Sequence, residues 1–383
     1  MHPTRTLLGV TAAVLVVGLA QGGPAPARRR PSDPTEIVAR VPSRRGEPAL
    51  AAIAAHERRS IAAPRDAAVA ADLARRLVGE ARRRSDPRYL GRAEAALRPW
   101  WDEVDPPDAV QLLRATIRQT RHEFVPALVD LDRLVARSPG DAQAQLSRAV
   151  VLTVLGRYPE ALAGCDAVER LTARAWGAAC RAPALARTGK LAEAEASLAA
   201  ALAGADADER AYTESILGEI GYWAGRPGAE ATLRHALAAD PSDVYTRGVL
   251  ADLLLDQGRA VEARALVAGH EANDALLLRL VLAERMLGEG GTPARAQLDA
   301  RLAAARLRGD AVHQREEARL ALSDDDAPRA LALALAGFAA QREPWDIRLV
   351  LDAARAAGDP VAAAPARAWL AAHPLASPRL EVR

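Results

Sequence analysis

Apolar residues recur along most of the chain at the three- and four-residue spacing of amphipathic helices. The helical segments, of roughly twelve to eighteen residues, alternate with short breaks. Ala and Leu dominate the apolar content, and both are strong helix formers. Runs in which Val, Ile or Thr alternate with polar residues are scarce, so the sequence lacks the strand-forming segments that a large sheet needs. The pattern predicts an all-α chain.

The breaks recur at a fixed interval. Pro139 and Pro241 are 102 residues apart, which is three times 34, and Pro241 and Pro344 are 103 apart. A second series of prolines opens helices, where the missing N–H costs nothing: Pro126, Pro159, Pro227, Pro293, Pro328 and Pro360. A series of glycines falls in the turn before those helices: Gly156, Gly189, Gly225, Gly258 and Gly288. The interval predicts a repeating unit of two antiparallel helices.

A 34-residue unit of two helices resembles the tetratricopeptide repeat. The best copy is AQAQLSRAVVLTVLGRYPEALAGCDAVERL. It matches the repeat's small, large, glycine, aromatic, alanine and closing apolar positions at Ala149, Leu152, Gly156, Tyr158, Ala161 and Val168. The resemblance is good from Pro107 to Gly269 and weakens toward both ends. It implies a right-handed α-solenoid of about nine antiparallel helix pairs, in which the first helix of each pair lines a concave groove.

The expected organisation has six parts. They are a signal peptide (1–27), a Pro- and Arg-rich linker (28–64), a capping helix pair (65–106), tetratricopeptide repeats (107–272), degenerate helical repeats (273–374) and a disordered tail (375–383). The stretch DPRYLGRAEAALRP, before Trp100 and Trp101, also resembles exported bacterial tetratricopeptide proteins of unassigned function. That resemblance supplies no mechanism.

The N-terminal segment allows two interpretations. Arg5 precedes an uncharged apolar stretch from Leu7 to Ala20, and Ala25-Pro26-Ala27 offers a small-x-small cleavage site. The expected location is therefore the periplasm or cell envelope, or outside the cell. The Arg28-Arg29-Arg30 run beyond the site opposes translocation, which would instead retain the segment as a membrane anchor. The chain would contact a membrane only in the second case.

Charge and motifs point away from nucleic acid and from catalysis. The 51 basic and 49 acidic residues leave a net charge of +2, so no overall field attracts a polyanion. The sequence has no phosphate-binding loop, HExxH helix, nucleophile elbow or calcium loop, and its seven histidines are scattered. We expect no catalytic residues, cofactor or metal. Asp324-Asp325-Asp326 precedes a helix and is better explained by capping than by metal binding.

Two cysteines fall on consecutive predicted helices. Cys165 lies on the second helix of one pair and Cys180 on the first helix of the next. An oxidising compartment would permit a disulfide between them, and the alternative is a pair of small buried thiols.

The expected function is that of a non-catalytic scaffold that binds a segment of a protein partner in the groove. If the register of the repeat holds, the groove-facing positions include Thr116, Gln119, Gln143, Val150, Thr153, Tyr212, Glu219, Tyr245, Asp252 and Arg285. They show no run of Arg or Lys that would bind a peptide carboxylate. Two other functions remain open: a helical-toroid enzyme acting on envelope polysaccharide, and a membrane-anchored assembly factor.

Overall fold

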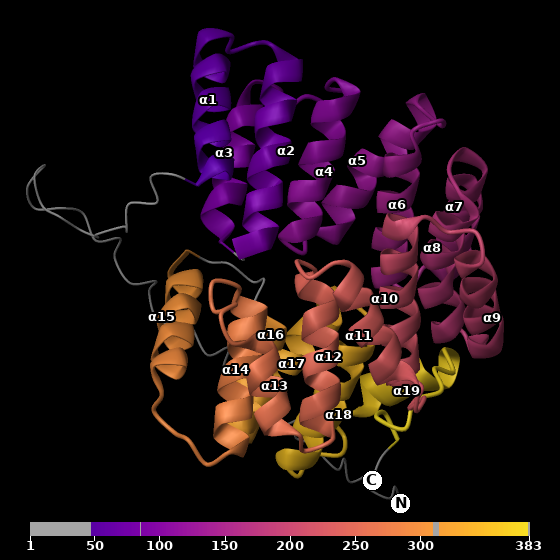
Figure 1. The fold of residues 1–383 in the computed structure, drawn as a ribbon, viewed down its shortest axis with the longest axis vertical. Helices are drawn as coiled ribbons and strands as arrows, with labels where there is room; N and C mark the ends of the chain where they lie inside the picture. The colour runs from indigo at the N-terminus through magenta and orange to yellow at the C-terminus, as the bar shows by residue number, and fades with distance from the viewer. Residues whose placement is uncertain (1–46, 85, 309–313, 382–383) are drawn as a thin grey trace, which may run out of the picture. The chain divides into compact units, whose positions relative to one another are not determined.

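Across residues 47–84, 86–308 and 314–381, which the computed structural model describes, the chain forms nineteen α-helices and no strand (Figure 1). These residues lie in one unit, Arg44–Arg383. A single helix, α1 (Pro48–Ala62), packs on α2, and nine helix pairs follow within the described ranges. The pairs are α2 (Ala67–Arg84) with α3 (Pro87–Leu97), α4 (Asp108–Thr120) with α5 (Phe124–Arg137), α6 (Ala142–Val154) with α7 (Tyr158–Leu171), α8 (Arg174–Arg187) with α9 (Leu191–Leu202), α10 (Ala207–Trp223) with α11 (Ala229–Ala239), α12 (Val244–Asp256) with α13 (Ala260–Val267), α14 (Asp274–Met286) with α15 (Pro293–Arg308), α16 (Gln314–Ser323) with α17 (Ala327–Ala340), and α18 (Pro344–Ala356) with α19 (Ala364–Ala372). The prediction of an all-α repeat solenoid is confirmed.

Local chemistry explains where the helices begin and end. The Asp141 and Asp243 side chains accept hydrogen bonds from the first-turn amides of α6 and α12, as N-caps do. Within several pairs the connecting turn needs a glycine, because Gly156 has φ of 77° and Gly258 has φ of 74°. This left-handed conformation is costly for residues with a Cβ atom. The predicted role of the turn glycines is confirmed.

Small residues let helices approach, and larger ones fill the remaining space. A Cβ atom added to Gly164 of α7 would lie 3.2 Å from the Ala149 Cβ of α6. Leu152 and Tyr158, at the large and aromatic positions of the repeat, are buried. Because each pair covers the apolar face of the next, the core runs along the solenoid from pair to pair.

The solenoid completes a turn, so that pairs distant in sequence meet. In Figure 1 the chain runs along one side of the unit from α1 to α9 and returns along the other from α10 to α16. The Asn273 side chain, which caps α14, donates a hydrogen bond to the Arg82 carbonyl oxygen at the end of α2 (3.5 Å). The Arg342 amide, just before α18, donates to the Val154 carbonyl oxygen of α6 (2.9 Å). In both cases the two bonded residues belong to helix pairs that are six pairs apart in the chain.

The contacts between distant pairs form a continuous seam, which we define as the line where α18, α19 and residues 373–381 meet the earlier pairs. The Trp369 ring of α19 lies edge-on to Tyr158 and against the turn at Gly156. Further along, Pro374 and Pro378 lie against the turns at Gly189 and Gly225. The seam therefore follows three successive inter-helix turns.

Two segments expected to be flexible contain ordered residues. The segment expected to be a linker at 28–64, with one short helix expected around Ala49 to Arg58, contains α1, whose Ile53 is buried in a core cluster with residues of α2. The tail expected to be disordered is ordered as far as residue 381: Leu380 is buried, and Arg379 donates a hydrogen bond to Asp256 (3.0 Å). Its few apolar residues find partners only because the solenoid returns on itself. The predicted signal peptide lies outside the described residues.

None of the helices within the described ranges combines the length and apolarity that crossing a membrane requires.

Candidate binding site

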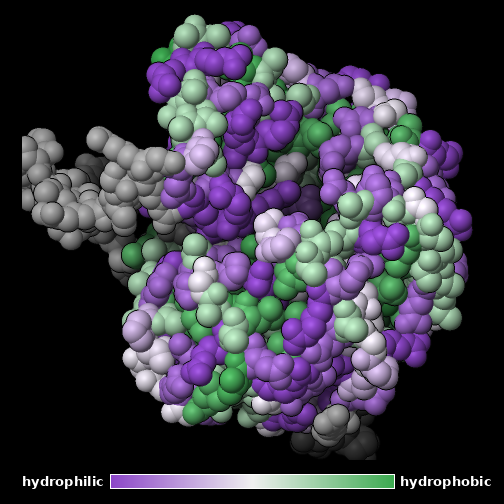
Figure 2. Space-filling view, viewed as in Figure 1, coloured by the Kyte–Doolittle hydropathy of each residue, from purple (hydrophilic) through white to green (hydrophobic). Residues whose placement is uncertain are grey.

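The concave side of the solenoid contains two adjoining open cavities of about 580 and 970 Å³. They share the lining residues Arg82, Glu219, Asp243 and Tyr245, so they form one space, which we call the central cavity. The space-filling view shows a hollow in this face with hydrophilic residues along much of its rim (Figure 2). The volumes are those typical of binding sites for small molecules or short segments.

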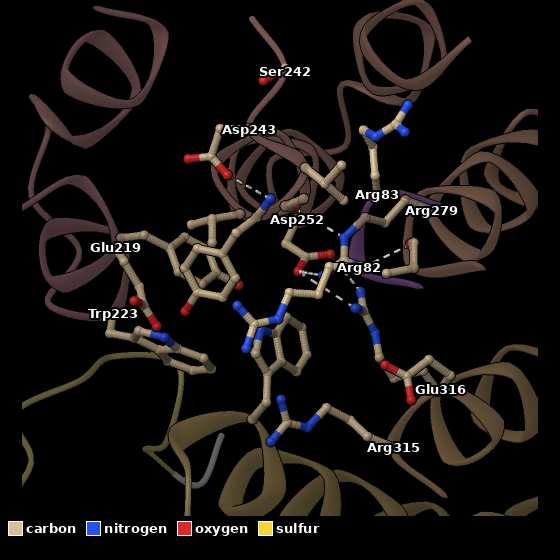
Figure 3. A pocket seen from close by; sticks show the side chains of 18 of the residues that line it. Arg82, Arg83, Glu219, Trp223, Ser242, Asp243, Asp252, Arg279, Arg315 and Glu316 are labelled. Carbon is tan, nitrogen blue, oxygen red and sulfur yellow. Dashed lines mark hydrogen bonds and ion pairs between the residues drawn. The ribbon is translucent and has the colours of Figure 1, made fainter. Parts of the chain in front are cut away.

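The smaller part of the central cavity is rich in arginine. We call it the arginine chamber, and its cationic lining residues are Arg82, Arg83, Arg279, Arg315 and Arg319. Figure 3 shows Arg83, Arg279 and Glu316 on one side of it and Glu219 and Trp223 on the other. The arginines come from α2, α14 and α16, so the chamber exists only because the solenoid returns to its first pair.

Most of these arginines are neutralised by carboxylates. The Asp252 carboxylate is buried and accepts from both Arg279 (2.6 Å) and Arg319 (2.7 Å). Arg315 pairs with Asp346 at the start of α18 (2.8 Å). These bonds join α12 to α14 and α16, and α16 to α18, across the concave side. They hold the chamber's walls together more than they offer charge to a ligand.

The larger part of the cavity is acidic. We call it the acidic chamber, and its carboxylate lining residues are Asp208, Glu219, Asp240, Asp243 and Glu343. Burial raises the pKa of Glu219, and the positive charge of Arg187 opposes this in part. Burial and the nearby Glu219 charge raise the pKa of the Tyr245 phenol. Tyr245 nevertheless remains 55% exposed, because it faces the cavity and not the packed interior.

The structure gathers most of the predicted groove residues in this cavity. Its lining includes Gln119, Val150, Thr153, Tyr212, Glu219, Tyr245 and Asp252. Three others are not among its lining residues. The Thr116 hydroxyl donates to the Leu112 carbonyl oxygen of its own helix (2.8 Å), Gln143 bonds Ser147 on α6, and Arg285 pairs with Asp324 and Asp325.

The sequence analysis did not predict the arginine chamber. The ten positions predicted to face the groove include one arginine, Arg285, and the chamber's arginines come from other positions: α14 and α16 each supply arginines, and Arg82 joins them from the capping pair. Because α14 to α17 keep few signature residues of the repeat, the sequence did not show which of their positions face the concave side. No signal along the sequence could have placed α2 beside α14, since that contact depends on the curvature summed over six pairs.

The other candidate sites have structural roles. The structure joins Cys165 and Cys180 by a disulfide, with a Cα–Cα distance of 5.5 Å. The Asp326 side chain caps α17 by accepting from the Arg329 amide, and Asp324 pairs with Arg295 (2.7 Å). Among the residues described, no group of His, Cys, Asp or Glu side chains is arranged to hold a metal ion.

Comparison with known proteins adds a likeness of fold. No protein-family model matches the chain, and no curated protein does. A human IFIT1 dimer solved with PPP-AAAA is 13% identical, with 74% of this chain and 80% of that chain covered and a TM-score of 0.46. A tetratricopeptide repeat protein from Parabacteroides merdae is 15% identical (73% and 98% covered, TM-score 0.36). The Cut9–Hcn1 hetero-tetramer of the APC/C is 16% identical (76% and 63% covered, TM-score 0.38).

These neighbours resemble the chain in fold only. The chain's own helix pairs, its 34-residue period and its turn glycines make it a helical-repeat solenoid of the tetratricopeptide type. Its concave side holds the central cavity, to which α2, α14 and α16 all contribute lining residues.

Proposed function

We propose that this protein is a non-catalytic scaffold of the cell envelope that binds an extended segment of a partner protein in the central cavity. The observation that carries the proposal is the cavity itself, which combines charged and polar lining residues with an exposed aromatic ring. Tyr245 lies where the two chambers meet and is 55% exposed, although it is surrounded by protein. Rigid aromatic side chains with a polar tip are common anchors in binding sites.

A preformed scaffold suits this role. The helices around the cavity are fixed by ion pairs such as Asp252 with Arg319, so a partner would not have to order them. Binding to a preorganised surface loses less conformational entropy than binding to a mobile one.

The envelope location rests on two features. The N-terminal segment has the pattern of a signal peptide, and the Cys165–Cys180 disulfide suits an oxidising compartment. Recovery of the chain from a periplasmic or envelope fraction, with its N-terminus near Arg28, would support export by a cleaved signal. Recovery from the cytoplasm with a reduced Cys165 would contradict it.

Site-directed photo-crosslinking tests the binding proposal. A photoreactive phenylalanine analogue replaces Tyr245 in the full-length protein, and the same analogue replaces Val261 in a matched control. Val261 is 60% exposed on α13, outside the cavity lining. We expect a discrete protein adduct from position 245 and none from position 261, with the crosslinked peptide identified by mass spectrometry.

Other adducts would decide against the proposal. Polysaccharide at position 245 would favour the enzyme that the sequence left open, and equal labelling at both positions would indicate nonspecific contact.

A further inference from the structure

One of four successive inter-helix turns lacks a glycine at its strained position. In the pairs from α6 to α11 the residue with positive φ is Gly156, Gly189 or Gly225. In the preceding pair, between α4 and α5, it is His122, with φ of 60°. A left-handed conformation is less favourable for a residue that has a Cβ atom. The departure from glycine therefore points to a role for the imidazole ring.

The His122 ring is held beside the central cavity. It stacks on Phe124, with 5.3 Å between the ring centroids and 20° between the ring planes. Phe124 is buried at the start of α5, so this contact orients the imidazole. Gln119, three residues earlier, lines the acidic chamber, and its carbonyl oxygen accepts a hydrogen bond from the His122 amide (3.0 Å). The α4–α5 turn thus adjoins the cavity wall.

Charged groups from the later pairs act on this ring. They lie at the beginnings of α16 and α18: Arg315, Glu316, Glu343 and Asp346. All except Asp346 also line the central cavity. On the side of the turn itself, Arg121 pairs with Glu94 of α3 (2.5 Å) and Glu123 precedes α5. The ring therefore lies between an early turn and a charged wall of the cavity.

The groups that face His122 already bind one another. Arg315 pairs with Asp346 (2.8 Å) and with Glu343 (3.5 Å), and Glu343 pairs with Arg187 of α8 (3.0 Å). This network joins α16 and α18 to α8. A further positive charge beside it would be repelled by Arg315 and would compete for carboxylates that already have partners.

Histidine can supply such a charge, because its protonation state changes between about pH 5 and pH 8. Burial lowers the pKa of His122, and the positive charge of Arg315 acts in the same direction, whereas Glu316, Asp346 and Glu343 oppose the shift only in part. A lowered folded-state pKa means that protonation is less favourable in the folded protein. The resulting stabilisation is complete above the unfolded pKa of about 6.5 and is lost as the pH falls from there through the folded value.

We propose that protonation of His122 weakens the contact of the α4–α5 turn with the beginnings of α16 and α18, and so loosens one wall of the central cavity in acid. The inference does not depend on which partner the cavity binds. An imidazolium ion is poorly solvated beside Arg315, and it gains access to water when the turn moves away. The contact is intact at neutral pH and weakens as the pH falls below about 6.5.

Hydrogen exchange of the full-length protein tests the inference. Amide protection factors, corrected for the intrinsic effect of pH on exchange, are compared at about pH 8 and about pH 5.5, on either side of the unfolded histidine pKa. The probes are the amides of the α4–α5 turn and of the start of α18, including the Arg342 amide that donates to Val154. We expect acid to lower protection severalfold at both places. His122→Asn should abolish this change, because asparagine tolerates positive φ and does not titrate.

Two further variants keep the result decisive. If His122→Asn fails to fold, His122→Gly takes its place, since glycine occupies the three neighbouring turns. The matched control is His235→Asn, which removes a histidine whose side chain is 65% exposed and pairs with Glu214 of α10. It should leave the acid response at the α4–α5 turn unchanged. In an NMR titration of the histidine rings, the signal that His122→Asn removes should have a midpoint below about 6.5.

Three results would overturn the proposal. They are an acid response that persists in His122→Asn, protection in the wild type that acid leaves unchanged or increases, and a His122 midpoint at or above the unfolded value. None of them would bear on the proposed binding of a partner segment, which the crosslink at position 245 tests separately.

Discussion

The pair α4–α5 and the pairs from α12 onward satisfy their buried charges in different ways. In α4–α5 the partners are close in the chain: Asp130 of α5 binds Arg114 and Arg118 of α4, its own partner helix. From α12 onward the partners are far apart in the chain. Asp252 binds Arg319 from 67 residues away, and Asp256 binds Arg348 from 92 residues away.

Both sides of the seam carry contacts with distant pairs. The earlier pairs meet the seam at their inter-helix turns, at Gly156, Gly189 and Gly225, and they keep the small and large signature residues of the repeat. The later pairs meet it through side chains outside that signature, such as Trp369 and Arg348, and through Arg379 beyond the last helix.

The largest expected effect comes from removing the carboxylates that satisfy buried arginines. Asp252→Ala and Asp130→Ala each leave two arginines without their partner, and each should lower the free energy of unfolding by about 3–5 kcal/mol. Hydrogen exchange should separate them. Asp130→Ala should increase exchange in α4 and α5, and Asp252→Ala in α12 and α14 to α19. The same exchange pattern in both variants would contradict a difference between the two regions.

The disulfide provides a second contrast, since it stabilises only the earlier repeats. Cys165 and Cys180 close a loop of 15 residues, and their simultaneous replacement by Ala should cost about 3 kcal/mol. Urea unfolding with and without a reductant measures the effect. The doubly substituted protein should be insensitive to the reductant. An unchanged wild-type curve under reducing conditions would show that the bond contributes nothing.

Two glycines with the same backbone conformation allow the contribution of the Trp369 contact to the free energy of unfolding to be measured by comparison. Gly156→Ala and Gly258→Ala both place a Cβ atom at positive φ, which costs about 1–2 kcal/mol. At Gly258 the new atom meets open space, whereas at Gly156 it overlaps the Trp369 ring. Thermal unfolding should therefore show an additional loss of about 1–3 kcal/mol for Gly156→Ala. Adding Trp369→Ala should remove that excess, and equal losses in the two glycine variants would mean that α19 does not press on this turn.

The smallest expected effect is a pH dependence of the stabilisation that Asp256 contributes to the seam. Burial alone would raise the pKa of Asp256, but hydrogen bonds and positive charge from Arg348, together with Tyr222 and Arg379, hold it below its usual value. A lowered folded-state pKa stabilises the protein above the unfolded pKa of about 4, and this contribution disappears as the pH falls through the folded value. Asp256→Asn should cost about 1 kcal/mol at neutral pH, because the amide keeps one acceptor oxygen. The difference should vanish in strong acid, and a constant difference at every pH would exclude the charge as its cause.

Patterns formed by residues close together in the sequence allowed much of the fold to be predicted. The 34-residue interval indicates the helix pairs, and Gly189 and Gly225 mark turns that need positive φ. The same register placed Tyr212, Glu219 and Tyr245 on the inner helices, where they line the cavity. It failed at Gln143 and Arg285, because an inner helix has exposed positions at its ends that contact neighbours or solvent.

The sequence by itself determined the local elements of this protein: amphipathic helices, their caps, their glycine turns and the stacking of each pair on the next. All depend on residues a few positions or one repeat apart. Only the tertiary structure decided that α2 meets α14 and α6 meets α18, and so that residues of α2, α14 and α16 line one cavity. Small rotations between neighbouring pairs accumulate over six pairs, and that sum, which no single repeat encodes, sets where the turn closes.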